Sequence, residues 1–156
     1  MNKYSVDQFV RAVIKGRRDF EGIKMPNARL VDEPQYEKFV KVLESSAEPL
    51  NMHGADLRKL VAWNGYFGEA DLRATDLSGA NFSGAYLAKA KLCRADVAGT
   101  YFTRTDLIEA DLTNIRNIDK ALDINRASFQ RTIADEATRK IIDEAIVEAA
   151  KSRWSA

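Results

Sequence analysis

Large apolar residues recur at every fifth position over a long central stretch of the chain. In the segment Ala70-Asp-Leu-Arg-Ala-Thr-Asp-Leu-Ser-Gly, Leu72 and Leu77 are two successive large residues. Between Leu50 and Asn114, thirteen such central positions follow one another: Met52, Leu57, Ala62, Phe67, Leu72, Leu77, Phe82, Leu87, Leu92, Val97, Phe102, Leu107 and Leu112. Only Ala62 among them is small. Nearly every residue two positions before a central one is Ala, Gly or Thr.

A repeat of five residues fits neither an α-helix nor one straight β-strand. In a helix of about 3.6 residues per turn, these positions would spread around the circumference, and in a strand successive ones would face opposite sides. The pattern fits units that each form a short extended side followed by a bend, because the central and small residues then point the same way. Stacked turns of such a chain bury a continuous apolar column. We expect these residues to fill it: Leu57, Phe67, Leu72, Leu77, Phe82, Leu87, Leu92, Phe102, Leu107 and Leu112.

The rhythm of Ala70-Asp71-Leu72, Ala80-Asn81-Phe82, Ala95-Asp96-Val97 and Ala110-Asp111-Leu112 resembles that of the pentapeptide repeat proteins. The resemblance implies a mainly β fold, a right-handed quadrilateral β-helix with four units per turn, spanning residues 1–156 as a single domain. It also implies a binding or scaffolding role. Some members of this family bind bacterial type II topoisomerases by mimicking the DNA backbone.

The N-terminal third predicts two helices around a first set of repeats. Ser5 and Gln8 form a capping-box pattern before an amphipathic stripe, which predicts a helix at about 5–15. Repeats follow at 18–32, in a frame that is offset by two from the later one. Between the two frames, Pro34 suits a first helical position, and apolar spacing predicts an inserted helix at about 34–46. This helix either carries function or only covers an edge.

The regular rhythm decays after Asn114, although we expect the main solenoid to extend over 50–131. Two final units in a shifted frame are predicted to place these residues inward: Leu122, Ile124, Ala127 and Phe129. Thr132 with Asp135 is expected to cap a last helix at about 133–151. Its apolar residues spread over more than one narrow stripe. One side would seal the last turn, and the remainder would suit a homodimer contact.

Composition and charge exclude several classes of function but do not identify the function. The formal net charge is +1, so no overall field draws the chain to nucleic acid or to an anionic membrane. We expect no direct nucleic-acid binding and no membrane insertion. Charged residues interrupt the N-terminal segment, which favours a cytoplasmic protein without a signal peptide. Cys93 is the only cysteine, so an internal disulfide and a multi-cysteine metal site are excluded.

Stacking residues twenty apart produces an acidic column with two interpretations. Its members are Asp56, Asp76 and Asp96, with Asp71 and Asp111 on the adjoining side. One interpretation, carried by the family resemblance, is a stripe that mimics DNA. The favoured interpretation is that Asp or Asn before a central residue accepts a hydrogen bond from nearby backbone at the bend. The near-neutral repeat region and a short stack, of roughly 22 Å at about 4.8 Å per turn, weigh against mimicry.

A second column places Tyr66 over Tyr86, with Trp63 one unit earlier and Tyr101 nearby. Aromatic residues on a rigid face among Gly and Ser are typical of a protein-binding hot spot. The alternatives are a stabilising ladder of rings and a ledge that the inserted helix covers. A third column, of Glu69, Lys89 and Glu109, alternates in sign and suits a solvated face.

Nothing in the sequence favours catalysis. His53 is the only histidine and is predicted to point outward, so no Ser-His-Asp or Cys-His arrangement is available without it. Glycines mark bends and have no phosphate-loop context. We therefore expect no catalytic, cofactor-binding or metal-binding residues. The leading expectation is a protein-interaction or scaffolding module that binds another protein, and the alternative is a DNA-mimicking modulator of a type II topoisomerase.

Overall fold

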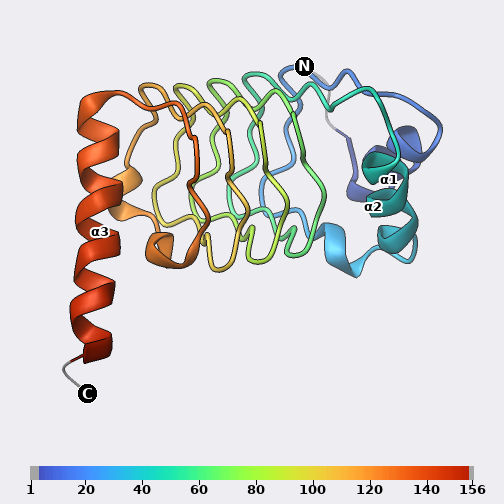
Figure 1. Ribbon diagram of the computed structural model, residues 1–156. Coiled ribbons are helices and arrows are strands. Elements are labelled where there is room, and N and C mark those ends of the chain that lie inside the picture. The colour runs from blue at the N-terminus through green and yellow to red at the C-terminus, as the bar shows by residue number, and fades with distance from the viewer. Residues whose placement is uncertain (1–3, 155–156) are drawn as a thin grey trace.

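The computed structural model describes residues 4–154 and shows stacked coils of chain with helices at both ends (Figure 1). Parallel bridges join each coil to the next and define four faces. Face A contains Asp19, Asn51, Asp71, Lys91, Asp111 and Ile133. Face B contains Lys24, Asp56, Asp76, Asp96 and Arg116. Face C contains Arg29, Val61, Asn81, Tyr101 and Leu122, and face D contains Tyr66, Tyr86, Asp106 and Ser128. Residues 1–3 and 155–156 of the expected domain lie outside the described residues.

One unit shows how the backbone satisfies its hydrogen bonds. Leu57 N–H donates to the carbonyl of Asp76 in the next coil at 2.9 Å, and Asp76 N–H donates to the carbonyl of Ala55 at 2.9 Å. Within the unit, Leu60 N–H donates to the Leu57 carbonyl at 3.0 Å and closes a β-turn. Each side is therefore held by bonds between coils, and each corner by a turn. Because each side pairs through one bridged residue, the bridges are isolated instead of forming long strands.

The interior is the apolar column that the five-residue pattern predicts. All thirteen central residues are at most 2% exposed, from Met52 to Leu112. The small positions beside them are buried as well, including three threonines. Their hydroxyls donate to the carbonyls of earlier residues, Thr75 to Met52 at 3.1 Å and Thr100 to Leu77 at 2.8 Å. A threonine is thus accommodated because its hydroxyl finds a backbone acceptor inside the stack.

Two helices stand at the N-terminal end. Helix α1, Val6–Ile14, has the predicted capping box, since Gln8 N–H donates to Ser5 Oγ at 3.2 Å. A 3-10 turn, η1 (Leu30–Asp32), leads into helix α2, Tyr36–Glu44. The expectation that Pro34 occupies the first helical position is wrong, because Pro34 and Gln35 lie in a turn before the helix. Helix α1 packs against α2, with the rings of Phe9 and Phe39 5.7 Å apart.

Helix α2 and the segment after it replace one side of the first complete coil. Faces A, B and C each begin with a residue from 19–29, whereas the bridged column of face D begins at Tyr66. The missing side would fall between Leu30 and Leu50, where α2 is found. The change of frame in the sequence therefore marks the place where the chain leaves the stack and returns.

The last coil uses two units of six residues. The bridged positions run from Arg116 to Leu122 and Ser128, and the 3-10 turns η2 (Ile118–Lys120) and η3 (Ile124–Arg126) take up the extra residues. Ile118 and Ile124 are buried. The expected inward position of Leu122 is wrong: it occupies the outward position of face C and is 40% exposed.

Helix α3, Glu136–Trp154, lies across the C-terminal end and contacts η2 and η3 (Figure 1). It begins three residues later than predicted, because Ile133 is still paired with Asp111 of face A. The cap is Asp135 and not Thr132: its carboxylate accepts from Thr138 N–H at 2.9 Å, while the Thr132 hydroxyl donates to the Phe129 carbonyl. No helix within residues 4–154 is long and apolar enough to cross a membrane.

Candidate functional site: an aromatic corner beside the inserted helix

Three aromatic residues gather where face C turns into face D, and we call them the aromatic corner: Trp63, Tyr66 and Tyr86. Trp63 is in the turn after Val61, and Tyr66 and Tyr86 are neighbours in the column of face D. The two tyrosine rings are stacked, with centroids 4.8 Å apart and planes 15° apart. Trp63 is 44% exposed and Tyr86 is 39% exposed. The corner is therefore an ordered surface with large accessible rings.

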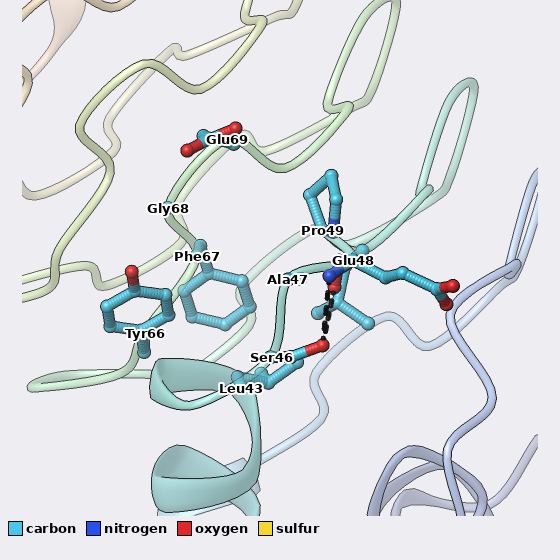
Figure 2. A pocket seen from close by; sticks show the side chains of 10 residues that line it. Leu43, Ser46, Ala47, Glu48, Pro49, Tyr66, Phe67, Gly68 and Glu69 are labelled. Atoms are coloured by element: carbon cyan, nitrogen blue, oxygen red, sulfur yellow. Dashed lines mark hydrogen bonds between the residues drawn. The ribbon is translucent and has the colours of Figure 1, made fainter.

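Gly68 makes the ring stack possible. A Cβ at this position would lie 2.8 Å from Cε1 of Tyr86 and 3.0 Å from Cζ of Tyr66, which is too close for carbon atoms. Tyr66 also packs against the core. Figure 2 shows its ring beside Phe67 and near Leu43 of α2, at the edge of a cavity of about 90 Å³. Burial is the main cause that raises the pKa of Tyr66. Tyr66 is thus partly a structural residue.

Helix α2 is attached to the aromatic corner through Tyr36. The Tyr36 hydroxyl donates to the backbone carbonyl of Trp63 at 3.0 Å. Gly65 permits this approach, since a Cβ there would lie 2.9 Å from the Tyr36 hydroxyl oxygen. The sequence placed Tyr36 on the apolar face of the inserted helix but did not reveal this contact. The one signal in the sequence is Gly65, the only glycine among the thirteen small positions from Leu50 to Ala110.

Tyr101 does not lie in the same column as the other aromatic residues. It is bridged to Asn81 and Leu122 on face C, where it is 43% exposed. The expected four-residue aromatic face is thus divided between two sides of the coil. A flat surface that contacts Tyr86 on face D does not automatically contact Tyr101.

The aspartates of the expected acidic column accept hydrogen bonds at the corners. Ser78 N–H donates to Asp76 at 3.0 Å, and Thr113 N–H donates to Asp111 at 3.0 Å. The same bond, from the N–H two residues later, is made to Asp19, Asn51, Asp56, Asp71, Asn81, Asp96 and Asp106. These residues recur because the bend needs an acceptor at this position. Aspartate and asparagine residues accept this hydrogen bond on all four faces, from Asp111 on face A to Asp106 on face D.

Cations neutralise much of the acidic column. Arg58 pairs with both carboxylate oxygens of Asp56 at 2.8 Å, and this hydrogen bonding lowers the pKa of Asp56. On face A, Arg73 forms the corresponding pair with Asp71 and lowers its pKa. Face B starts at Lys24 and ends at Arg116, whose guanidinium is 3.8 Å from Asp96. The column is therefore short and bounded by positive charge.

His53 and Cys93 line a shallow hollow at one corner of face A, together with Arg73 and Arg94. Burial is the main cause that raises the pKa of the Cys93 thiol, which leaves less of the nucleophilic thiolate. Within residues 4–154, no group of three or more His, Cys, Asp and Glu side chains is arranged to hold a metal ion. The aromatic corner and α2 remain the surface with the most distinctive chemistry.

Comparison with known proteins agrees with the repeat architecture. The model of pentapeptide repeats matches residues 51–87 and 80–116, in eight copies. No curated protein matches the chain. QnrB1, a plasmid-mediated fluoroquinolone resistance protein, is similar in structure with a TM-score of 0.50 and 18% identity, over 82% of this chain and 61% of QnrB1.

Two other solved structures are similar to the chain at lower scores. Rfr23, a pentapeptide repeat protein from the cyanobacterium Cyanothece 51142, has 20% identity and a TM-score of 0.44, over 76% of this chain and 84% of its own. HetL, a pentapeptide repeat protein involved in heterocyst differentiation regulation in Nostoc sp. strain PCC 7120, has 24% identity and a TM-score of 0.35, over 74% of this chain and 48% of its own. The five-residue units, their four-sided stacking and the family match to residues 51–116 lead to one conclusion: this repeat segment belongs to the pentapeptide repeat family.

Proposed function

We propose that the chain is a non-catalytic protein-interaction module whose partner binds at the aromatic corner. The observation that supports this proposal is the accessibility of Trp63 and Tyr86, at 44% and 39%, on a rigid stack of coils. Tryptophan and tyrosine dominate the residues that carry binding energy at protein interfaces. The Tyr86 ring is already held by its stack on Tyr66, so it loses little conformational freedom on binding.

The proposal competes with a purely structural role for the same rings. The stack of Tyr66 on Tyr86 stabilises face D whether or not a partner binds. Trp63 has no such stacking partner among the described aromatic pairs, which include neither Trp63 nor Tyr101. Measuring binding and stability separately on the same variants therefore distinguishes the two roles.

The test is quantitative capture of partners by the tagged full-length chain from a native extract. We expect Trp63→Ala and Tyr86→Ala each to reduce recovery of a specific partner by about tenfold or more, the effect of losing a hot-spot residue. Tyr101→Ala is the matched control, because Tyr101 is equally exposed but lies on face C. Recovery of every partner at unchanged levels with both corner variants would show that the corner is not the binding surface.

DNA mimicry is less well supported as a function. A mimic needs a dense negative field along one surface, whereas Asp56, Asp76 and Asp96 form a short column between Lys24 and Arg116. Two aspartates that are twenty residues apart in sequence, Asp56 and Asp76, also share the guanidinium of Arg58. The expected homodimer contact through α3, which would lengthen such a surface, stays a prediction.

A further inference from the structure

A groove runs between helix α2 and the aromatic corner, and we call it the α2 groove. Its volume is about 540 Å³, and its apolar lining includes Val31, Pro34, Val40 and Trp63. Val40 packs partly against the core, so this part of the lining is anchored to the rest of the protein. A volume of this size accommodates one or two large apolar side chains of a ligand.

The walls of the α2 groove are fixed to each other. Tyr36 lies in the wall, and its hydroxyl binds the carbonyl of Trp63 at 3.0 Å. The Tyr36 ring stacks on Phe39, which is fully buried, at a centroid distance of 5.9 Å. Both rings belong to α2, so their contact fixes the Tyr36 ring within the helix. Helix α2 cannot move away from Trp63 without breaking the Tyr36 hydrogen bond and exposing the buried Phe39 ring. A preformed groove binds a segment without a large cost for ordering itself.

Most of the charged residues that line the α2 groove, which we call its rim, are carboxylates. Glu33, Glu37 and Glu44 all line it, against a single cation, Lys41. Within residues 4–154, none of these three glutamates takes part in an ion pair; the nearby Asp32, by contrast, is paired with Arg29 at 2.5 Å. The rim has a net formal charge of −2, from three glutamates and one lysine. This charge is complementary to cations and repels phosphate and other carboxylates.

We infer that the α2 groove binds a short segment of a partner protein in which one large apolar side chain is flanked by lysine or arginine. The apolar side chain would lie in the groove beside Trp63, and the flanking cations would meet the rim glutamates. A guanidinium close to the exposed indole gains a cation–π contact as well. This inference rests on the proposed function and adds the chemistry of the partner to it.

The test uses the fluorescence of Trp63 in the full chain carrying Trp154→Phe, which leaves Trp63 as the only tryptophan of the two. The probes are a nine-residue peptide with a central leucine flanked by arginines and its twin with glutamates in place of the arginines. We expect saturable changes in Trp63 emission with the arginine peptide, at least about tenfold tighter than with the glutamate peptide. Raising the salt concentration is expected to weaken binding of the arginine peptide.

Reversing the charge of rim glutamates is the second part of the experiment, and it tests whether they bind the arginines of the peptide. Glu37→Lys combined with Glu44→Lys is expected to weaken binding of the arginine peptide by roughly tenfold, at the usual strength of exposed ion pairs. Glu48→Lys is the matched control, because Glu48 is exposed nearby and does not line the α2 groove. Thermal unfolding of each variant checks that the fold is intact.

Two results would overturn the inference: no binding of the arginine peptide at millimolar concentration, or equal binding of both peptides. A third result separates it from the proposed function. If a captured partner is lost with Trp63→Ala and Tyr86→Ala but is unchanged by the double charge reversal, the aromatic corner is the binding surface and the α2 groove is not.

Discussion

At the residue scale, the corners of the coils impose a backbone conformation that most residues avoid. Lys59, Ala74, Lys89 and Arg94 all have φ between 55° and 62°, in the left-handed region. For a residue with a Cβ this conformation costs about 1–2 kcal/mol, whereas glycine adopts it freely. The fold accepts the strain because each such N–H bonds to the next coil, as Lys59 does to Ser78 at 2.9 Å.

Ala74→Gly is therefore expected to stabilise the protein. Relief of the left-handed strain exceeds the extra entropy of glycine in the unfolded chain, so we predict a gain of about 0.5–1 kcal/mol in the free energy of unfolding. Urea unfolding measures it. Gly99→Ala is the reverse control, since Gly99 has φ 66° and its added Cβ would meet only Gly79 atoms at 3.9 Å. A less stable Ala74→Gly protein would contradict the prediction.

The residue scale also shows what the sequence could reveal. The inward positions follow from size alone, because only large apolar and small residues fit the column. The acceptor role of Asp76 and Asp111 follows from their place before a bend. The left-handed backbone at Ala74 and Arg94 could not be predicted, because neither side chain favours a positive φ. The contact of Tyr36 with Trp63 joins distant segments, and local patterns do not encode it.

At the element scale, the ends of helices were harder to predict than their existence. Pro34 is suited to a first helical turn, yet Pro34 and Gln35 form a turn after η1, and α2 begins at Tyr36. Ile133 is used by face A before α3 can begin. Five-residue units in a shifted frame predict that Leu122 points inward, but η2 and η3 lengthen the units to six, so that Leu122 points outward. Pairing between coils decided the start of α3 and the outward position of Leu122.

Asp135 joins helix α3 to the last coil, which makes its role dependent on pH. Its carboxylate accepts from the N–H groups of Thr138 at 2.9 Å and Asn114 at 2.7 Å, and these bonds lower its pKa from 3.8 to about 2. Because the folded pKa lies below the unfolded one, the stabilisation is complete above about pH 4 and is lost as the pH falls toward 2.

Asp135→Ala is expected to lower the free energy of unfolding by about 1 kcal/mol at neutral pH, the usual cost of losing a helix cap. The difference from the parent protein is expected to shrink between pH 4 and pH 2, where Asp135 becomes protonated. Thermal unfolding across this range measures it. Asp143→Ala, at an exposed position within α3, is the control and is expected to change stability by less than about 0.5 kcal/mol at every pH. A constant difference down to pH 2 would exclude the proposed role of the carboxylate.

At the scale of the whole molecule, positive and negative charges are balanced. The chain has 24 Lys and Arg against 23 Asp and Glu, and the acidic column of face B ends in a cation at both ends. The acidic column of face B is therefore no longer than three residues. The mixed charge agrees with a local role of the aspartates, which accept backbone hydrogen bonds at the corners of the coils.

We therefore predict that the purified chain leaves DNA supercoiling by purified gyrase unchanged at micromolar concentration. Lys24→Glu combined with Arg116→Glu extends the acidic column to five residues and serves as the comparison. An effect that appears only in this double variant would show that the cations prevent mimicry. Inhibition or protection of gyrase by the unaltered chain, rising with its dose, would contradict the prediction.

The stacking of coils has a consequence for how the length of such a molecule changes. Each central coil adds twenty residues and meets only the coils beside it, as the bridge from Tyr66 to Tyr86 illustrates. Deleting residues 91–110 would join Ala90 to Asp111 at an equivalent position on face A, because Lys91 and Asp111 are bridged there, and would remove neither α2 nor α3. The two ends would then approach by one step of about 4.8 Å. The distance between the two ends therefore changes in steps of one coil. Gain or loss of a coil changes that distance and leaves the sequence of both ends unchanged.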